Sequence, residues 1–454
     1  MKRGAAEGPH SASTPWWRAR PPGPWAGLAL VAVAAGIAVA LGGPDPRTMP
    51  VDPASVFDPA HRRLAAEYAE IKYSLWATGT LLRWGFLAGL LVLAGGVPLS
   101  RLGRRIGRGR PLPSSFLTAV LLLAALVFVA LPVAWTSGFL VEHRFGLSTR
   151  SAGAWLLDTA RRQGFWIVVY GLAAAGFLGC LRRWPRWGWV AAAAGGTLMA
   201  VAGTTVAPVL IDPLFADFRP LDDRELEREI VAMGERAGLE IERVRVVDAS
   251  RRTRRLNAYV AGLGATRQVV LYDNLLVEAP REEILLVVAH ELGHAGERHV
   301  RTGLLLAIPG IFAGAWLLTG VARWQARRNS RLAGPGDPAG LPLLWLAVSI
   351  LLFLASPIEG AISRRMEAEA DWIALELSRD PDTFARVTRR LACSNLSPLT
   401  PPGWIVRWFY THPPVLERIG MSECWRENGL SCSTSTSPIR SPSRLPLMLR
   451  GSCR

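Results

Sequence analysis

The stretch REEILLVVAHELGHAGERHVRTGLLLAIPGIFAGAWLLTGV (281–321) joins two kinds of sequence without a break. Its first part, 281–299, has apolar residues at helical spacing and acidic residues in the first turn, which predicts a helix. Its second part, Thr302–Val321, approaches the length of about 20 apolar residues that a bilayer-spanning helix needs. The stretch therefore predicts a helix of a water-exposed domain that runs directly into a membrane span.

Six other apolar segments approach the same length. They are Trp25–Gly43, Ala77–Leu99, Phe116–Gly138, Gly164–Leu181, Gly188–Leu210 and Leu341–Ile362. Half of the 454 residues are hydrophobic and the mean hydropathy is +0.22, which is high for a soluble protein. Core helices of a soluble protein would give shorter runs with amphipathic stripes. We therefore predict seven transmembrane helices, the first of them retained because no clear small-x-small cleavage site follows it.

Arginine supplies almost all of the net charge of +16. Much of it lies in short loops between apolar runs, such as RLGRRIGRGR (101–110) and LRRWPRW (181–187). This pattern is typical of contact with anionic lipid headgroups and of orientation signals. No nucleic-acid-binding motif accompanies it, so we expect membrane lipids and no nucleic acid among the partners. The five cysteines form no C-x-x-C pair and do not identify a compartment.

Residues 211–300 are charged and periodic, and they predict a domain outside the bilayer. A helix is expected over 221–238, a strand over 241–250, and a hairpin over 257–264 and 266–273. The predicted organisation is a basic disordered arm (1–24), a membrane domain with five helices (25–210), a peptidase domain (211–300), transmembrane helices six and seven (301–362), the C-terminal part of the peptidase domain (363–426) and a disordered tail (427–454).

His290 and His294 are four residues apart and project from one face of the predicted helix. That spacing allows two imidazole nitrogens to reach one zinc ion at about 2.0–2.1 Å. Glu291 lies beside the first histidine, where its carboxylate can take a proton from a water on the metal. The same motif also arises by chance on helices that bind no metal, so it does not establish a site alone.

A catalytic zinc ion needs a third protein ligand and one open position. Glu367 and Asp371 are again four residues apart, in SRRMEAEADWIALEL (363–377), a predicted helix that continues the seventh apolar run. Glu367 is the candidate ligand, and Asp371 can accept the outer N–H of a ligating histidine. Taken alone, the pair is as typical of a solvated acidic face balanced by Arg364 and Arg365. His299 is an alternative ligand, but its spacing is expected to point it off the helix face.

Two further residues are candidates for substrate contacts. His412 lies in YTHPPVLERIG (410–420), a proline-containing loop, where it could donate a hydrogen bond to an oxyanion. Asn257 lies in RRLNAYVAG (254–262); if this is an edge strand, it can pair with an extended peptide. Each residue also has an interpretation without a function: His412 as an ordinary loop histidine, and Asn257 as an asparagine at the start of a strand.

These pieces, in this order, resemble the CAAX prenyl protease 1 type of integral-membrane zinc metalloendopeptidases. The resemblance runs from the first apolar run to Ile419 and includes SGFLVEHRFGLST (137–149), APVLIDPLFADFRPLDDREL (207–226), VVDASRRTRRLNAYVAGLG (246–264), VVLYDNLL (269–276), the HELGH core, SRRMEAEAD (363–371) and THPPVLERI (411–419). Asn274 stands where the family usually has threonine, and we expect little effect. The tail with Cys432 and Cys453 is not family-like.

The resemblance implies a fold, a cofactor and a set of roles. Seven helices would enclose a water-filled chamber, with an α+β zinc-peptidase domain inserted between helices five and six. One Zn²⁺ per chain would be bound by His290, His294 and Glu367, with Glu291 as the base. Asp371 would support a ligand, Asn257 would hold the substrate backbone and His412 would stabilise the transition state.

The resemblance also implies a peptide or protein substrate, whose lipid modification stays open, and we expect a monomer. Its alternatives are a membrane-protein quality-control protease and a non-catalytic scaffold with a closed zinc site, in which His299 would be a fourth ligand. Arginine-rich, lysine-poor composition suggests a bacterial plasma membrane. The positive-inside rule puts the arginine-rich loops in the cytoplasm, whereas the resemblance puts the peptidase domain there. We expect the second orientation.

Overall fold

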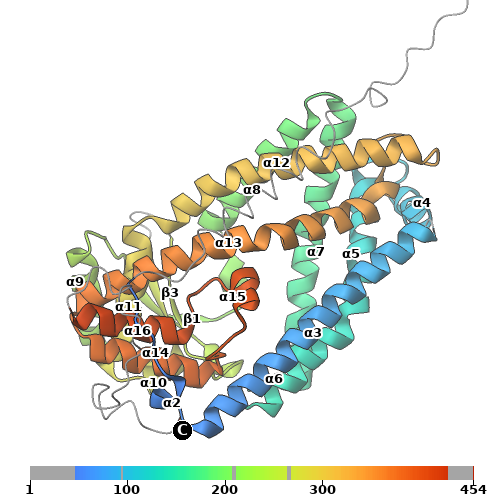
Figure 1. The fold of residues 1–454 in the computed structure, drawn as a ribbon. Helices are drawn as coiled ribbons and strands as arrows, with labels where there is room; N and C mark the ends of the chain where they lie inside the picture. Colours follow the sequence, from blue (N-terminus) through green and yellow to red (C-terminus); the bar gives the residue numbers. More distant parts are fainter. Residues whose placement is uncertain (1–46, 94–95, 207–210, 263–266, 428–452, 454) are drawn as a thin grey trace, which may run out of the picture.

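The computed structural model describes residues 47–93, 96–206, 211–262, 267–427 and 453. The long helices meet near α4 at one end of the molecule and spread apart from there, and a small sheet with shorter helices lies at the far end of α12 and α13 (Figure 1). The apolar run Trp25–Gly43, the arm and most of the tail lie outside the described residues. The described Cys453 forms a disulfide with Cys393, which the sequence did not predict.

Five helical segments of the described chain are long and apolar enough to cross a membrane. They are α3 (Pro59–Val92), α5 (Pro111–Trp135) with its continuation to Arg144, α7 (Ala152–Arg183), α12 (His299–Arg328) and α13 (Leu341–Ser378) with the turn before it. The fifth apolar run forms α8 (Gly188–Val206), which is not among these five. The predicted total of seven spans is therefore not established, whereas a multi-span helical architecture is.

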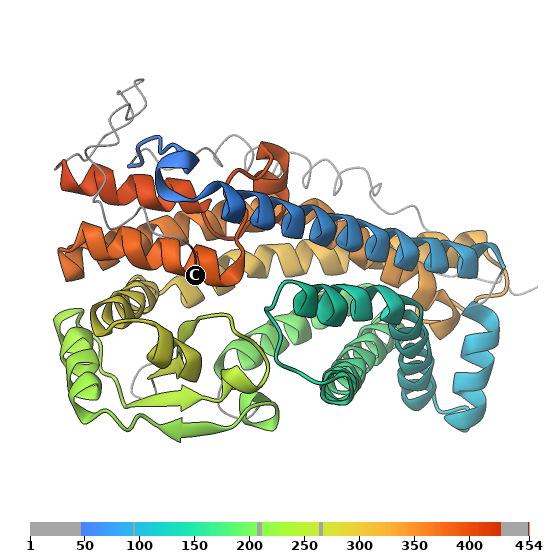
Figure 2. The same ribbon diagram turned by 90° about the horizontal axis from the view of Figure 1, so that it is seen from below.

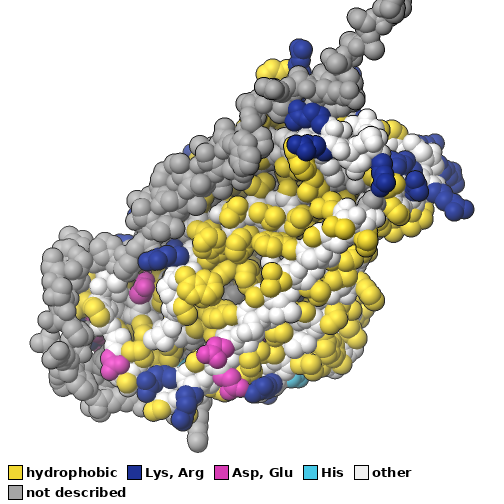
Figure 3. Space-filling view, turned by 45° about the vertical axis from the view of Figure 1, so that its right-hand side comes forward, with side chains coloured by type: hydrophobic (Ala, Val, Ile, Leu, Met, Phe, Trp, Pro, Cys, Tyr) yellow, Lys and Arg dark blue, Asp and Glu magenta, His cyan; other side chains and the backbone are white. Residues whose placement is uncertain are grey.

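Large apolar side chains cover the outside of these helices (Figure 3). Leu81 on α3, Phe128 on α5, Leu172 on α7 and Leu352 on α13 each expose more than half of their surface. Apolar surface of this extent is normally covered by lipid or by another protein. Inside the bundle, leucines of α3, α5, α7 and α13 form a separate core.

Short helical elements lie between or beside the longer helices and strands. They are α2 (Pro53–Val56), α4 (Gly96–Ile106), η2 (Thr136–Leu140), α6 (Val141–Arg144), η4 (Asp212–Leu214), η5 (Ala249–Arg251) and η7 (Pro338–Gly340). The π-helical η2 joins α5 to α6 without a break, and α4 packs against α5 and η7.

The sheet has four strands in the order β1 (Phe218–Pro220), β2 (Arg243–Val247), β4 (Gln268–Tyr272) and β3 (Ala258–Ala261). The predicted hairpin is confirmed, because β3 and β4 pair antiparallel with Ala258 opposite Leu271. β2 pairs parallel with β4, and β1 pairs antiparallel with β2. β1 was not predicted, because three residues ending in proline carry no alternating pattern.

Helices from two distant parts of the chain pack around this sheet. They are α9 (Arg224–Arg236), α10 (Asp273–Glu278), α11 (Arg281–Gly296), α14 (Pro381–Asn395), α15 (Gly403–Phe409) and α16 (Val415–Arg426). Figure 2 shows α11 and the sheet, in yellow and green, on one side of the orange and red C-terminal helices. One continuous core of apolar side chains joins them, with Ile230, Leu271, Leu292 and Phe384 fully buried.

The expectation of one helix over 281–299 is wrong at its end. α11 stops at Gly296, and α12 begins at His299 after a turn in which Arg298 adopts a left-handed φ of 55°. The left-handed residue changes the direction of the chain. As a result, His299 lies back against His294 instead of pointing off the helix face.

Gly293 allows α11 and α13 to approach closely. A Cβ atom at this position would lie 3.1 Å from the Ala370 Cα, 3.2 Å from its carbonyl oxygen and 3.3 Å from the Ile373 Cβ. Two of these three neighbours are backbone atoms that cannot rotate away. The contact between the two helices therefore depends on a residue without a side chain at this position.

Gly293→Ala is expected to move α11 away from α13 by a few tenths of an ångström. Overpacking of this kind typically costs about 1–3 kcal/mol, so the variant should unfold at a lower temperature and retain less metal. Gly296→Ala is the matched control, because a Cβ there meets nothing within 4 Å. Thermal unfolding in detergent and metal content by mass spectrometry would test this; equal behaviour of the two variants would contradict it.

Candidate metal site

Two helices bring the three predicted ligands together. His290 and His294 lie on one face of α11, and their Nε2 atoms are 3.2 Å apart. Glu367 of α13 places its Oε2 atom 3.3 Å from the His290 Nε2 and 3.4 Å from the His294 Nε2. Donor atoms of residues up to 77 positions apart in sequence thus lie within 4.8 Å of one another.

The spacing of these atoms fits a tetrahedral metal ion. Ligand bonds of about 2.0–2.1 Å at a tetrahedral angle place neighbouring donor atoms about 3.3 Å apart, which matches all three separations. In addition, the Glu367 Oε2 is buried and lies 3.3–3.4 Å from the Nε2 atoms of His290, His294 and His412. A buried carboxylate oxygen surrounded by imidazole nitrogens is stabilised when a cation binds between them.

Glu291 lies next to His290 on α11 and is partly buried. The backbone N–H of Val260, on β3, donates a hydrogen bond to its carboxylate. Burial raises the pKa of Glu291, and the negative charge of Glu367 adds to this, although the two histidines oppose it. A carboxylate with a raised pKa beside the three donor atoms is suited to receive and return a proton.

Asp371 supports the first histidine from behind. Its Oδ1 lies 2.8 Å from the His290 Nδ1, and Arg418 of α16 contacts both of its oxygens at 2.7 and 2.8 Å. Burial lowers the pKa of His290, but the hydrogen bond and charge of the fully buried Asp371 outweigh it and raise the pKa to about 10. The contact with Asp371 fixes the Nδ1 side of the ring and leaves the Nε2 facing the other two donor atoms.

Arg418 was not assigned a role from the sequence. The guanidinium holds Asp371 in place through a paired contact, and a buried carboxylate needs such compensation. The only signal in the sequence was its position four residues after Pro414, where a short helix was expected to begin. That signal does not identify a partner 47 residues earlier in the chain.

His299 supports the second histidine. Its Nδ1 lies 2.9 Å from the His294 Nδ1, and its Nε2 lies 3.2 Å from the Glu369 Oε2. The expectation that His299 points away is therefore wrong, because the left-handed Arg298 turns the chain back. His299 contacts the outer nitrogen of His294, so its Nδ1 is not directed at the point shared by the three donor atoms. In this position His299 would orient His294 rather than act as a fourth ligand.

The loop that carries His412 comes close to Glu367. The His412 Nε2 lies 3.3 Å from the Glu367 Oε2, and its Nδ1 lies 3.0 Å from the Thr411 hydroxyl. Arg364 holds the loop by donating to the carbonyls of Val406 at 2.9 Å and Tyr410 at 2.7 Å. The alternative in which Arg364 balances an exposed acidic face is therefore wrong, because its guanidinium is turned toward α15 instead.

Asn257 precedes β3, which is an edge strand of the described sheet and packs against α11. Its side chain is exposed, and its carbonyl accepts a hydrogen bond from the Tyr272 backbone. Asn274 fixes the segment before it by donating to the carbonyls of Thr253 and Arg255 at 3.2 and 2.7 Å. The structure thus places the outer edge of β3 beside the helix that carries Glu291.

Arg255 ties this strand to the membrane helices. It donates to the Tyr68 hydroxyl of α3 at 2.6 Å and to Glu142 of α6 at 3.1 Å. Lys72 contacts the same Glu142 at 3.0 Å. The segment leading to Asn257 is therefore positioned by side chains of the membrane part, which no local sequence pattern indicated.

Two family models together match almost the whole described chain. Residues 220–423 match the model of peptidase family M48. Residues 45–217 match the model described as CAAX prenyl protease N-terminal, five membrane helices.

Relatives and a solved structure agree with these matches. A Bacillus subtilis protein named uncharacterized metalloprotease YhfN is 31% identical over 82% of this chain and 88% of its own length. The CAAX prenyl protease 1 of Saccharomyces cerevisiae is 27% identical over 66% of this chain and 70% of its own. The crystal structure of Saccharomyces mikatae Ste24p superposes with a TM-score of 0.75, at 21% identity, over 88% of this chain and 98% of that one.

His299→Ala is expected to weaken metal binding without unfolding the protein. Loss of a residue that orients a ligating histidine typically costs about 10- to 100-fold in metal affinity. Glu369→Gln should give a smaller loss, and exposed Arg301, two residues away, provides the control Arg301→Ala. Competition with a chelator of known affinity would measure the effect. Equal metal affinity of the His299 and Arg301 variants would show that His299 does not position His294.

Proposed function

Because this chain belongs to peptidase family M48 and is an integral-membrane metalloprotease, we propose that it is an endopeptidase with one zinc ion held by His290, His294 and Glu367. The observation that carries this proposal is the separation of 3.2–3.4 Å between the three donor atoms. Two nitrogens and one carboxylate oxygen are the ligand set of many catalytic zinc sites, and the fourth position stays free for the reaction.

Bound zinc would supply a Lewis acid that activates water and polarises the scissile carbonyl. Glu291 would take a proton from the attacking water and return it to the leaving amine. Its position beside the donor atoms and its raised pKa support this role. Asp371 and Arg418 would keep the His290 ring oriented while charge changes around it.

His412 would donate a hydrogen bond to the oxyanion of the transition state. The Thr411 hydroxyl can donate to the Nδ1 of His412, which leaves the proton on the Nε2 that faces Glu367. Asn257 and the outer edge of β3 would hold the substrate in an extended conformation by main-chain hydrogen bonds. Val260 on the same strand contacts Glu291, so substrate and base would lie side by side.

The proposed substrates are peptides or protein segments that reach the site at the membrane. Relatives with the name CAAX prenyl protease 1 support peptides with a C-terminal CAAX sequence, with or without a prenyl group, as the first class to test. A scaffold with a closed zinc site is disfavoured, because His299 contacts the outer nitrogen of His294. A protease of membrane-protein quality control would use the same zinc-dependent peptide hydrolysis.

Glu291→Gln is expected to abolish cleavage while zinc stays bound, because the amide cannot accept a proton but preserves the shape of the side chain. His412→Ala should retain zinc and lower kcat by about 100-fold or more, the usual effect of losing an oxyanion donor. Mass spectrometry of a farnesylated CAAX peptide and its unmodified twin, after incubation with the purified protein, would measure both. Loss of zinc from the Glu291 variant would refute its role as base.

The same assay tests whether cleavage depends on zinc, whether the lipid is recognised and whether CAAX peptides are substrates. Chelation should stop cleavage and added zinc should restore it. The ratio of the rates for the two peptides tells whether the lipid is recognised. Cleavage of neither peptide by a protein that contains one zinc per chain would exclude CAAX peptides as substrates and favour another protein substrate.

We propose that the peptidase part faces the cytoplasm of a bacterial plasma membrane. The relation to family M48 supports this orientation, although the arginine-rich loops lie at the opposite end of the bundle (Figure 1). Positive charge at that end need not act as an orientation signal if it has a separate binding role.

Reporter fusions would test the orientation directly. A phosphatase that is active only outside the cytoplasm should be active when fused after residue 105 and inactive when fused after residue 454. Fluorescent protein fused at the same two positions should give the reverse pattern. Phosphatase activity at 454 but not at 105 would instead support the orientation that follows from the positive-inside rule.

A further inference from the structure

Arginine gathers where the ends of all five candidate spans meet. The segments 93–110, 181–187 and 322–340 contain twelve arginines and a single acidic residue, Asp337. They connect α3 to α5, follow α7, and join α12 to α13, so they lie together at one boundary of the membrane part. Arginine side chains stand out at this end in the space-filling view (Figure 3).

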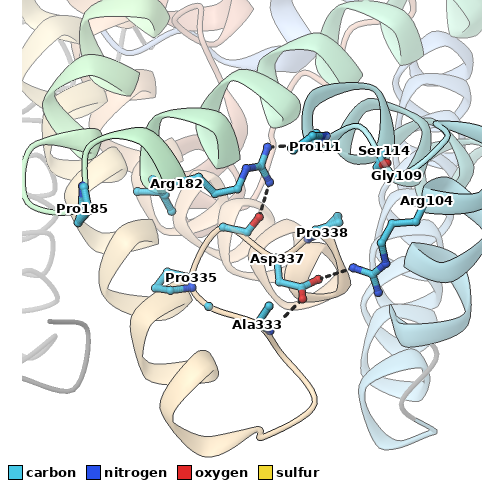
Figure 4. Close-up of a pocket in the computed structure, with 13 residues that line it drawn as sticks. Arg104, Gly109, Pro111, Ser114, Arg182, Pro185, Ala333, Pro335, Asp337 and Pro338 are labelled. Atoms are coloured by element: carbon cyan, nitrogen blue, oxygen red, sulfur yellow. Dashed lines mark hydrogen bonds and ion pairs between the residues drawn. The ribbon is translucent and has the colours of Figure 1, made fainter. Parts of the chain in front are cut away.

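A pocket of about 370 Å³ lies within this boundary. Figure 4 shows Arg104 of α4 and Arg182 of α7 on its walls, with Ser114 at the first turn of α5. The turn 333–338 before α13 closes it. The volume is within the range of about 300–1,000 Å³ that is typical of small-ligand sites.

Among the described residues, no carboxylate lies within ion-pair distance of the Arg182 guanidinium, and the charge of Asp337 acts on it only from farther away. Its guanidinium donates to neutral oxygens, the Ser115 hydroxyl at 3.0 Å and the Gly336 carbonyl at 2.6 Å. Arg104 shares the pocket and contacts the one acidic residue, Asp337, at 3.3 Å. Two guanidinium groups and one carboxylate therefore leave the pocket with a net positive charge.

Ser114, which also lines the pocket, has a buried hydroxyl, and this observation is independent of the charge of the arginines. Its side chain is 3% exposed, and its hydroxyl makes no hydrogen bond with the described residues. A buried hydroxyl without a partner costs free energy unless a ligand or water satisfies it. Ser114 is one of the residues that line the same pocket as the two arginines.

We propose that this pocket binds the phosphate group of an anionic phospholipid. Arginine and hydroxyl donors match phosphate oxygens, and basic pockets between transmembrane helices are a common place for anionic headgroups. Leu181 and Pro185 add apolar surface to the wall, next to the boundary where acyl chains begin. A lipid is favoured over a soluble phosphate ester because the pocket lies at the ends of membrane spans.

Lipid retention by the full-length protein in detergent would test the proposal. Wild type would be mixed with phosphatidylglycerol or phosphatidylcholine of the same acyl chains, and bound lipid would be counted by native mass spectrometry. Inorganic phosphate and glycerol phosphate would be added in separate arms. Wild type should retain phosphatidylglycerol in preference to phosphatidylcholine, and millimolar phosphate should compete only weakly.

The chain offers matched control variants. Arg104→Gln and Arg182→Gln each remove a charge from the pocket, whereas Arg105→Gln and Arg183→Gln remove the exposed neighbouring charge. The pocket variants should lose at least about fivefold in phosphatidylglycerol affinity, more than their controls lose. Ser114→Ala removes only the unpartnered hydroxyl, and its affinity for phosphatidylglycerol should fall about three- to tenfold. This variant keeps the proposal testable if an arginine variant fails to fold.

Three results would overturn the proposal. Equal losses in the pocket variants and their neighbours would mean that surface charge alone attracts the lipid. Retention of phosphatidylcholine equal to that of phosphatidylglycerol would show that the site does not discriminate lipids by the charge of the headgroup. Binding of inorganic phosphate or glycerol phosphate as tight as that of phosphatidylglycerol, and sensitive to the same variants, would assign the pocket to a soluble phosphate compound instead.

Discussion

The packing of α11 against α13 is the contact on which the rest of the site depends. α11 supplies two imidazoles and the neighbouring Glu291, and α13 supplies the third donor atom and the carboxylate behind His290. Neither helix forms a site alone, since two histidines on a helix face leave a metal ion short of ligands. The approach of the two backbones at Gly293 brings the donor atoms to metal-binding distance. The sheet, α14 and α16 bury the outer surfaces of both helices and hold this arrangement.

Local periodicity was sufficient to predict most of the elements that build the site. The spacing of His290 and His294 follows from the helical repeat, and the same repeat paired Glu367 with Asp371. The β3–β4 hairpin and the helix α9 were also recognisable from their patterns. The juxtaposition of α11 and α13 required the resemblance to a known family, because residues 77 positions apart give no local signal of contact.

The supporting residues were not predictable in this way. Arg418 and Arg364 look like surface charges in the sequence, yet one holds Asp371 and the other holds the carbonyls of the loop before His412. His299 was misplaced because a single left-handed residue, Arg298, interrupts the helical repeat. In the membrane part, apolar length predicted the spans, but it did not indicate that a buried hydroxyl and two arginines share a pocket at their ends.

α13 links the arginine-rich end of the membrane part to the candidate metal site in one continuous helix. It is one helix of 38 residues that begins among the arginine-rich turns, passes through the membrane part and ends beyond Asp371. At 1.5 Å per residue its length is about 57 Å, so a small tilt at one end becomes a displacement at the other. Helices adjust to bilayer thickness mainly by tilting, and Pro357 within α13 is the point where such a helix bends most readily. A change in membrane thickness that tilts α13 would therefore also shift Glu367 relative to α11, with a bend at Pro357 absorbing part of the tilt.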